Sequence, residues 1–93
     1  MNSSENSTFN VQLLAQPRNY LKRVDKTTQK RIATAIEEIS ANPVNGANIK
    51  QLRGSSQKYR CRVGDLRLIY NVKIEERLII IEAIGSRGDI YKK

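Results

Sequence analysis

The sequence predicts an α+β fold in which a helical hairpin covers one face of a four-stranded sheet. A short alternating segment comes first, two helical patterns follow it, and three strand patterns joined by tight turns fill the second half of the chain. Helices and strands that are segregated along a chain in this way are typical of α+β domains. The 93 residues suffice for one hydrophobic core, since a domain of this size buries roughly 60 to 65% of its unfolded surface.

A polar leader and one strand precede the helices. Residues 1–8 are small and polar, so we expect a disordered leader followed by a single domain over residues 9–93. Residues 9–14 alternate between an apolar face and a mostly polar one. This period of two predicts a short strand with one buried face.

Two helices form the predicted hairpin. Pro17 suits the first turn of a helix that ends near Val24, and Asp25 is the expected N-cap of the next helix. That second helix runs from about residue 26 to residue 41, with isoleucines at helical spacing on its core face. Asn42 ends it, because a residue that precedes proline is pushed out of the helical region.

Residues 57–70 carry the clearest strand pattern and predict a β-hairpin. Apolar side chains on its first strand alternate with three cations, and this alternation puts the cations on one face. These cations are Lys58, Arg60 and Arg62. Gly64 opens a two-residue loop, because glycine adopts the positive φ that a primed turn requires. The second strand is almost entirely apolar, so the presence of the charged Arg67 within it requires an explanation.

The last strand is predicted from the apolar run at residues 78–84. A strand that is apolar on both faces belongs in the interior of a sheet. Glu82 is the exception within the run, and it either pairs with an arginine or lies toward the strand end. Residues 49–56 form a basic loop or a short strand before the hairpin, and residues 73–77 form a polar turn after it.

The charge balance is strongly basic, with 17 Lys and Arg against 9 Asp and Glu and a net charge of +8. Such a field attracts polyanions, so nucleic acid, an acidic protein partner and anionic lipid are the candidate ligands. The chain has no histidine. Acid or base catalysis would therefore have to use Lys, Arg, Tyr, Asp, Glu or Ser.

The single cysteine and the lack of long apolar runs exclude several classes of protein. The single cysteine, Cys61, excludes an internal disulfide and is expected to be an inert core thiol. No apolar run approaches the roughly 18 residues of a membrane span, and the N-terminal segment lacks the apolar centre of a signal peptide. We therefore expect a cytoplasmic protein that does not bind membranes.

Arginines from all three C-terminal strands are expected to converge. Arg60 and Arg62 leave the first strand of the hairpin and Arg67 leaves the second, while Arg87 and Tyr91 follow the last strand. If these strands are neighbours, the five residues meet on the uncovered face of the sheet. Guanidinium groups grip phosphate bidentately, and a tyrosine ring offers a stacking plane for a base. Such a set suits a single-stranded RNA backbone.

Two explanations remain open for the strand cations. Arg67 has apolar neighbours, and burial of an unpaired charge costs several kcal/mol. Either a functional role or an ion pair with Glu82 would account for it. We assign further RNA contacts to surface side chains, although Arg53 and Lys58 fit a solvated surface equally well. These RNA-binding candidates are Lys50, Arg53, Lys58, Arg62 and Ser86.

The same residues form a pattern that resembles the RelE branch of the RelE/ParE toxin superfamily. The stretch KQLRGSSQKYRCRVGDLRLIYNV and the later GSRGDIY follow the family's K-x-L-x-G loop, its Y-[RK]-x-[RK]-x-G-x-[YL]-R-[LIV]-[IV]-Y hairpin and its terminal G-x-R-x-x-[VI]-Y. The resemblance covers about residues 48–91. It implies a type II toxin that acts as a metal-independent, ribosome-dependent endoribonuclease, cuts mRNA in the A site and inhibits translation.

The resemblance also implies roles for individual residues. The implied catalytic residues are Arg60, Arg67, Arg87 and Tyr91. Arg60 and Arg62 match the family's two basic strand residues, and Arg67 matches its phosphate-binding arginine. Arg87 matches the arginine linked to the leaving group, and Tyr91 the tyrosine that stacks on or orients the nucleotide. The implied partners are a cognate antitoxin, mRNA and the 16S rRNA of the ribosome, with no cofactor and no metal.

The sequence departs from the family pattern in three places, two of which concern proton transfer. Arg60 stands where some members have lysine, and a guanidinium is a poor general base. Ser86 stands where many members have histidine. The chain stops two residues after Tyr91, so the C-terminal helix of some relatives is not expected here. Our hypothesis is that Tyr91 accepts the proton, with a pKa lowered by nearby guanidinium groups.

Two alternatives share the same fold. A ParE-like toxin would inhibit DNA gyrase without cutting RNA, and a non-catalytic basic module would merely hold an acidic antitoxin. The terminal GDIY and the paired strand arginines favour the RNA branch.

Overall fold

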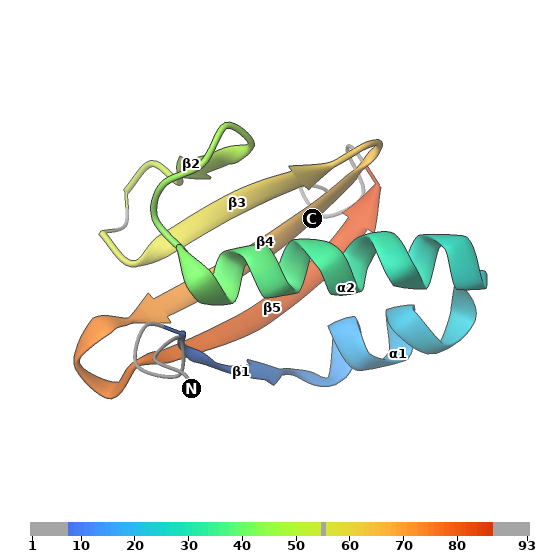
Figure 1. Ribbon diagram of the computed structural model, residues 1–93, viewed down its shortest axis with the longest axis horizontal. Helices are drawn as coiled ribbons and strands as arrows, with labels where there is room; N and C mark the ends of the chain where they lie inside the picture. Colours follow the sequence, from blue (N-terminus) through green and yellow to red (C-terminus); the bar gives the residue numbers. More distant parts are fainter. Residues whose placement is uncertain (1–7, 55, 87–93) are drawn as a thin grey trace.

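The computed structural model describes residues 8–54 and 56–86, in which two helices pack on one face of a five-stranded sheet (Figure 1). The predicted α+β class is confirmed. The sheet has the strand order β1-β5-β4-β3-β2. The elements are β1 (Asn10–Leu13), α1 (Ala15–Arg23), α2 (Lys26–Ala41), β2 (Ile49–Gln51), β3 (Lys58–Val63), β4 (Leu66–Lys73), a 3₁₀ turn η2 (Ile74–Glu76) and β5 (Leu78–Ser86).

The predicted strand count of four was wrong by one, because residues 49–51 form the edge strand β2. This strand pairs antiparallel with β3, with Ile49 opposite Cys61. Three residues are too few to show a period of two, so only the pairing defines the strand. At the other edge β1 pairs parallel with β5. The sequence placed β5 in the interior of the sheet, and it lies there between β1 and β4.

The helix boundaries agree with the sequence signals. Pro17 lies in the first turn of α1, and the Asp25 carboxylate caps α2 by accepting a hydrogen bond from the Thr28 N–H at 3.0 Å. The hydrogen bonds from Thr28 lower the pKa of Asp25. The Asn42 N–H donates to the Glu38 carbonyl at 3.0 Å and closes the last turn. No helix within the described part of the chain has the length and apolarity to cross a membrane.

The core lies between the helical hairpin and strands β4 and β5. Ile32 and Ile39 of α2 are fully buried. Tyr70 on β4 is also fully buried, and its hydroxyl donates to the Pro43 carbonyl at 2.7 Å. The Gln16 amide ties the start of α1 to β5 through two hydrogen bonds of 2.8 Å with the backbone of Ile84. These contacts fix both helices against one face of the sheet.

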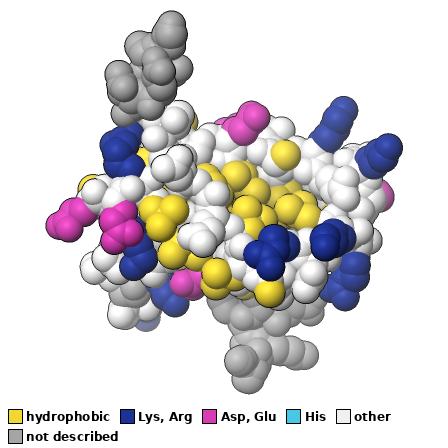
Figure 2. Space-filling model, turned by 90° about the horizontal axis from the view of Figure 1, so that it is seen from below, with side chains coloured by type: hydrophobic (Ala, Val, Ile, Leu, Met, Phe, Trp, Pro, Cys, Tyr) yellow, Lys and Arg dark blue, Asp and Glu magenta, His cyan; other side chains and the backbone are white. Residues whose placement is uncertain are grey.

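The underside of the molecule exposes part of its apolar surface. Figure 2 shows hydrophobic side chains across the middle of this face, with cations around them. Leu14, between β1 and α1, is 44% exposed, and Val11, Leu13 and Leu21 are half-buried. The strand cations lie on another surface, the face of the sheet that the helices leave uncovered.

Candidate nucleic-acid interface

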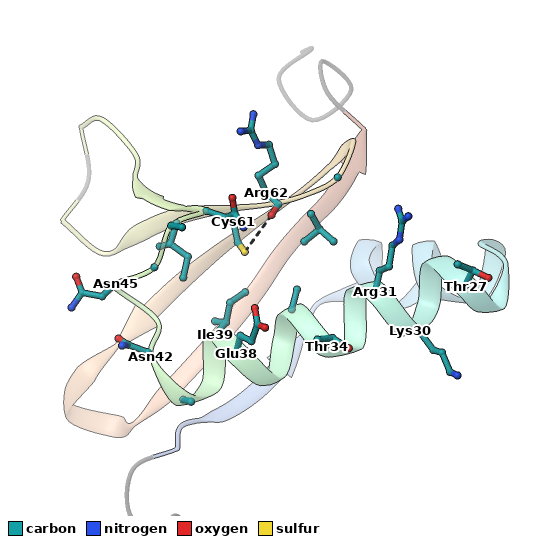
Figure 3. A pocket seen from close by; sticks show the side chains of 18 residues that line it. Thr27, Lys30, Arg31, Thr34, Glu38, Ile39, Asn42, Asn45, Cys61 and Arg62 are labelled. Atoms are coloured by element: carbon teal, nitrogen blue, oxygen red, sulfur yellow. Dashed lines mark hydrogen bonds between the residues drawn. The ribbon is translucent and has the colours of Figure 1, made fainter.

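The cations of β3 and β4 lie on the face of the sheet that the helices leave uncovered. Cys61 and Leu68 are buried beneath the helices. Neighbouring side chains on a strand point to opposite faces. Arg60 and Arg62 on β3, together with Arg67 on β4, therefore share the open face. Figure 3 shows Arg62 pointing away from α2, as this alternation requires.

The strand register places two arginines directly opposite each other. Arg62 on β3 faces Arg67 on β4, and on the other side Arg67 faces Gly85 of β5, which has no side chain. Directly opposed side chains have Cβ atoms about 4.5–5.5 Å apart, and like charges in such a pair destabilise the sheet. Lys50 on β2 lies opposite Arg60 and extends the row of cations. An anion held between these guanidinium groups would relieve their repulsion.

Two hollows flank the Arg62–Arg67 pair, and both arginines line both of them. The smaller hollow, of about 90 Å³, reaches toward β2. The larger, of about 320 Å³, reaches toward the β3–β4 turn and the end of β5. The other residues of the smaller hollow are Ala47, Asn48, Lys50 and Arg60, and those of the larger are Gly64, Asp65 and Ser86. The sequence-predicted set of Lys50, Arg60, Arg62, Arg67 and Ser86 is therefore brought together.

The β3–β4 turn forms one wall of the larger hollow. Gly64 has a φ of +59°, as predicted for the first loop position, whereas Asp65 does not have a positive φ. A positive φ at the first loop position alone is typical of a type II′ turn. This tight turn holds the Asp65 backbone beside the two arginines.

Two further predicted residues, Lys58 and Arg53, line neither hollow. Lys58 forms an ion pair with Glu82, with 3.0 Å between Nζ and a carboxylate oxygen. The sequence left open whether Glu82 pairs with an arginine or lies toward the strand end, and in the structure its ion-pair partner is a lysine. A register shift between Ile69 and Tyr70 makes Glu82 an extra residue in β5, and this bulge sets where its carboxylate reaches. Arg53 follows β2 in a turn and lines neither hollow.

Two of the proposed catalytic residues, Arg87 and Tyr91, lie outside the described residues. Their roles stay predictions.

Two polar residues of the hollows are not among the site residues predicted from the sequence. Asn48 precedes β2, and its carbonyl accepts from the Arg62 N–H at 2.9 Å, which holds Asn48 at the smaller hollow. Asp65 is the second residue of the predicted hairpin loop and lines the larger hollow beside Arg62 and Arg67. Its place in the loop between two arginine-bearing strands was the available signal.

The described groups favour charge stabilisation over nucleophilic catalysis. Cys61 is buried, as expected of a core thiol, and desolvation together with the nearby Glu38 carboxylate raises its pKa to about 11. It therefore stays protonated at neutral pH. Within residues 8–54 and 56–86, no three metal-ligating side chains gather. Three guanidinium groups share the open face, so the site can bind an anion and stabilise charge that develops on it.

Comparison with known proteins assigns the family. The sequence model of a family described as the ParE toxin of type II toxin-antitoxin systems, parDE, matches residues 11–91. A protein of Methanocaldococcus jannaschii named as a candidate toxin, RelE1, is 35% identical over 86 residues, which cover 90% of this chain and 96% of that protein. The chain belongs to the RelE/ParE family of type II toxins.

Solved structures agree with this family in fold. The toxin resembles a chain in the archaeal RelE–RelB complex from Pyrococcus horikoshii OT3, with 27% identity and a TM-score of 0.78 over 88% of this chain and 98% of that one. It also resembles a chain in the RelB–RelE antitoxin–toxin complex from Methanococcus jannaschii, with 27% identity and a TM-score of 0.69 over 87% and 95% of the two chains. Both relatives were solved with an antitoxin.

Proposed function

We propose that this toxin is a ribosome-dependent endoribonuclease that cleaves mRNA in the A site and thereby inhibits translation. The observation that carries the proposal is the Arg62–Arg67 pair, directly opposed on the open face and flanked by two hollows. The pair offers a bidentate clamp for a phosphate, and the hollows offer room for the groups on either side of it. Together these features suit a phosphodiester in a flexible single strand.

The proposed chemistry is transesterification within the RNA. The 2′-hydroxyl loses its proton and attacks the adjacent phosphorus, the bond from phosphorus to the 5′-oxygen breaks, and that oxygen takes up a proton. The products are a 2′,3′-cyclic phosphate and a 5′-hydroxyl. Because the nucleophile comes from the substrate, guanidinium groups can supply the main electrostatic stabilisation without a metal ion.

Each cation has a part in this proposal. Arg67 and Arg62 hold the scissile phosphate, and Arg60 with Lys50 binds the neighbouring phosphate at the smaller hollow. Ser86 contacts the nucleotide from the end of β5. The roles of Arg87 at the leaving oxygen and of Tyr91 as proton acceptor rest on the family resemblance.

The proposed setting is a toxin–antitoxin pair in the cytoplasm. The partners are mRNA, the 16S rRNA of the decoding site and a RelB-like antitoxin. Association with RNA depends on the net charge of +8, so binding should weaken as salt rises.

The test is primer extension on a defined mRNA in a purified translation system, with and without ribosomes. We expect cuts within A-site codons that require ribosomes. Arg67→Ala should lower the cleavage rate by about 100- to 1,000-fold, as removal of one preorganised stabilising group typically does. Arg67→Lys should restore only part of the rate, because lysine keeps the charge but loses the fork.

Arg23→Ala is the matched control, since it removes an exposed guanidinium from the far end of α1. It should leave the cleavage rate within about twofold of wild type. Intact mRNA in the presence of wild-type toxin and translating ribosomes would overturn the proposal. If Arg23→Ala and Arg67→Ala lowered the cleavage rate equally, the effect of Arg67 would be explained by net charge alone.

Gyrase inhibition is the second candidate, because the matching family model is described as that of the ParE toxin. A supercoiling assay with purified gyrase separates the two functions. Inhibition of supercoiling together with intact mRNA would favour the gyrase function. If the toxin were inactive in both assays, the non-catalytic basic module would be the remaining alternative.

A further inference from the structure

The two hollows beside the Arg62–Arg67 pair differ in charge. Among the described residues, neutral and cationic side chains line the smaller hollow. The larger hollow also has the carboxylate of Asp65 in its lining. A phosphate is attracted to the first hollow and repelled by this carboxylate in the second. The two hollows therefore suit different parts of an RNA strand.

The two hollows also differ in size. Pockets that enclose small molecules begin at roughly 300 Å³, which the larger hollow reaches with about 320 Å³ and the smaller one, with about 90 Å³, does not. A compact phosphate fits the smaller hollow, where Lys50 and Arg60 supply positive charge. A planar base needs the larger space. Because Arg62 and Arg67 line both hollows, a nucleotide held at this pair can reach either of them.

The β3–β4 turn places Asp65 at the wall of the larger hollow. Gly64 adopts a φ of +59°, and Val63 pairs with Leu66 across the turn. On the helix side, the Arg31 Nη1 would lie 3.3 Å from a Cβ placed on Gly64. This close approach limits movement of the turn toward α2 and keeps the Asp65 backbone at the hollow. The Asp65 residue is exposed, so its carboxylate is accessible to a ligand.

A carboxylate distinguishes RNA bases by the hydrogen bonds that they donate. An ionised carboxylate only accepts hydrogen bonds. Adenine, cytosine and guanine each present an exocyclic amino group that can donate to it, as the cytosine N4 group does to aspartate or glutamate in other complexes. Uracil has no amino group, and its N3–H lies between two carbonyl oxygens that repel a carboxylate. Asp65 therefore favours the three amino-bearing bases.

We infer that the larger hollow is a base subsite in which the Asp65 carboxylate accepts a hydrogen bond from the amino group of a base, so that uracil is disfavoured there. The inference rests on the RNA-binding part of the proposed function and adds a base preference to it. Asp65 is then a specificity-determining residue, whereas Arg62 and Arg67 hold the phosphate of any sequence. By repelling phosphate from the larger hollow, Asp65 also sets the register of the strand on the arginine pair.

Short single-stranded RNAs test the subsite without ribosomes. Octamers of cytidine and of uridine have the same backbone and charge, but only cytidine carries an amino group. We expect the wild-type toxin to bind the cytidine octamer about tenfold more tightly in fluorescence anisotropy. Equal affinities, tighter binding of the uridine octamer, or binding of neither would overturn the inference.

Paired variants assign the preference to Asp65. Asp65→Asn keeps the side-chain shape and suits a turn, but its amide both donates and accepts, so it can also pair with uracil. The preference for cytidine should fall from about tenfold to within about twofold, mainly through tighter binding of the uridine octamer. Glu75→Gln is the matched control, because it removes the same charge from an exposed position on η2 that lines neither hollow.

The control variant should keep the tenfold preference, about as strong as in the wild type. A preference that stays near tenfold in Asp65→Asn would overturn the role of Asp65. An equal fall in Asp65→Asn and Glu75→Gln would also overturn it, because the effect would then follow net charge.

Backbone-amide NMR locates the bound base. The cytidine octamer should shift the signals of Gly64 and Ser86, while Gly54, which lies outside both hollows, should not shift. An abasic octamer of the same length carries the phosphates alone, so it should shift the signals of Arg62 and Arg67 and leave that of Gly64 nearly unchanged. Equal shifts of Gly64 with the two RNAs would overturn the placement of a base in the larger hollow.

The cleavage assay separates the base preference from the proposed nuclease. Changing an A-site codon from uracil to cytosine one position at a time should speed cleavage about tenfold at one position in the wild type and at none in Asp65→Asn. Equal cleavage of all these codons by the wild type would overturn the preference and leave the nuclease intact. Uncut mRNA together with a cytidine preference in binding would overturn the nuclease alone.

Discussion

Replacement of Arg62 by glutamate should stabilise the toxin while it weakens the proposed RNA site. In the wild type, Arg62 lies directly opposite Arg67, and Arg62 is exposed at the surface. The substitution removes a cross-strand repulsion worth a few tenths of a kcal/mol and adds an attraction of similar size. The free energy of unfolding should therefore rise by roughly 0.5 kcal/mol at low ionic strength. For a domain of this size, this corresponds to an increase in Tm of roughly 2–4 °C.

Thermal unfolding followed by circular dichroism measures this effect. The Tm values should rise in the order wild type, Arg62→Gln, Arg62→Glu, and the differences should shrink in about 1 M salt, where the Debye length is near 3 Å. Arg53→Glu is the control, because it lowers the net charge equally from a turn that lines neither hollow. If Arg62→Glu were no more stable than Arg53→Glu at low salt, the opposed arginines would not repel and the reasoning would fail.

Three further predictions concern the core, a helix cap and the thiol. Tyr70→Phe removes the buried hydrogen bond to the Pro43 carbonyl and should cost about 1–2 kcal/mol in urea unfolding. Asp25→Ala should lower the Tm and Asp25→Asn should restore most of it, since asparagine also caps helices. Because the folded pKa of Asp25 is lowered, its stabilising effect is present at neutral pH and is lost as the pH falls below about 4 toward the folded pKa. Cys61 should react with iodoacetamide at pH 8 more than about 100-fold more slowly than a free thiol, because its pKa is about 11.

The same thiol predicts a pH dependence of stability at high pH. The unfolded thiol ionises first, from a value of 9.0, while the folded thiol holds its proton to about 11. Stability should therefore fall as the pH rises through that interval, and Cys61→Ala should make the fall less steep. An unchanged slope in Cys61→Ala, an unaltered unfolding midpoint in Tyr70→Phe, or a Tm of Asp25→Asn as low as that of Asp25→Ala would contradict the respective predictions.

Most of the local structure could be predicted because its signals are local. Asp25 and Asn42 bound α2 in the structure as they do in the sequence, since capping and the effect of proline act within a few residues. The period of two in β3 likewise separated the buried Cys61 from its arginine neighbours. The set of cations on the open face followed from this alternation and from the family motif together.

The tertiary structure alone decided which strands are neighbours and which side chains meet. The strand at residues 49–51 has no readable period and exists through its pairing with β3, and the partner of Glu82 depends on a bulge opposite Ile69 and Tyr70. The hollows beside Arg62 and Arg67 likewise join residues from β2, β3, β4 and β5 that are distant in the sequence. The sequence by itself determined the elements, their buried faces and the basic charge, because periodicity and capping are short-range effects. Register and bulges arise from long-range packing, which no single segment encodes.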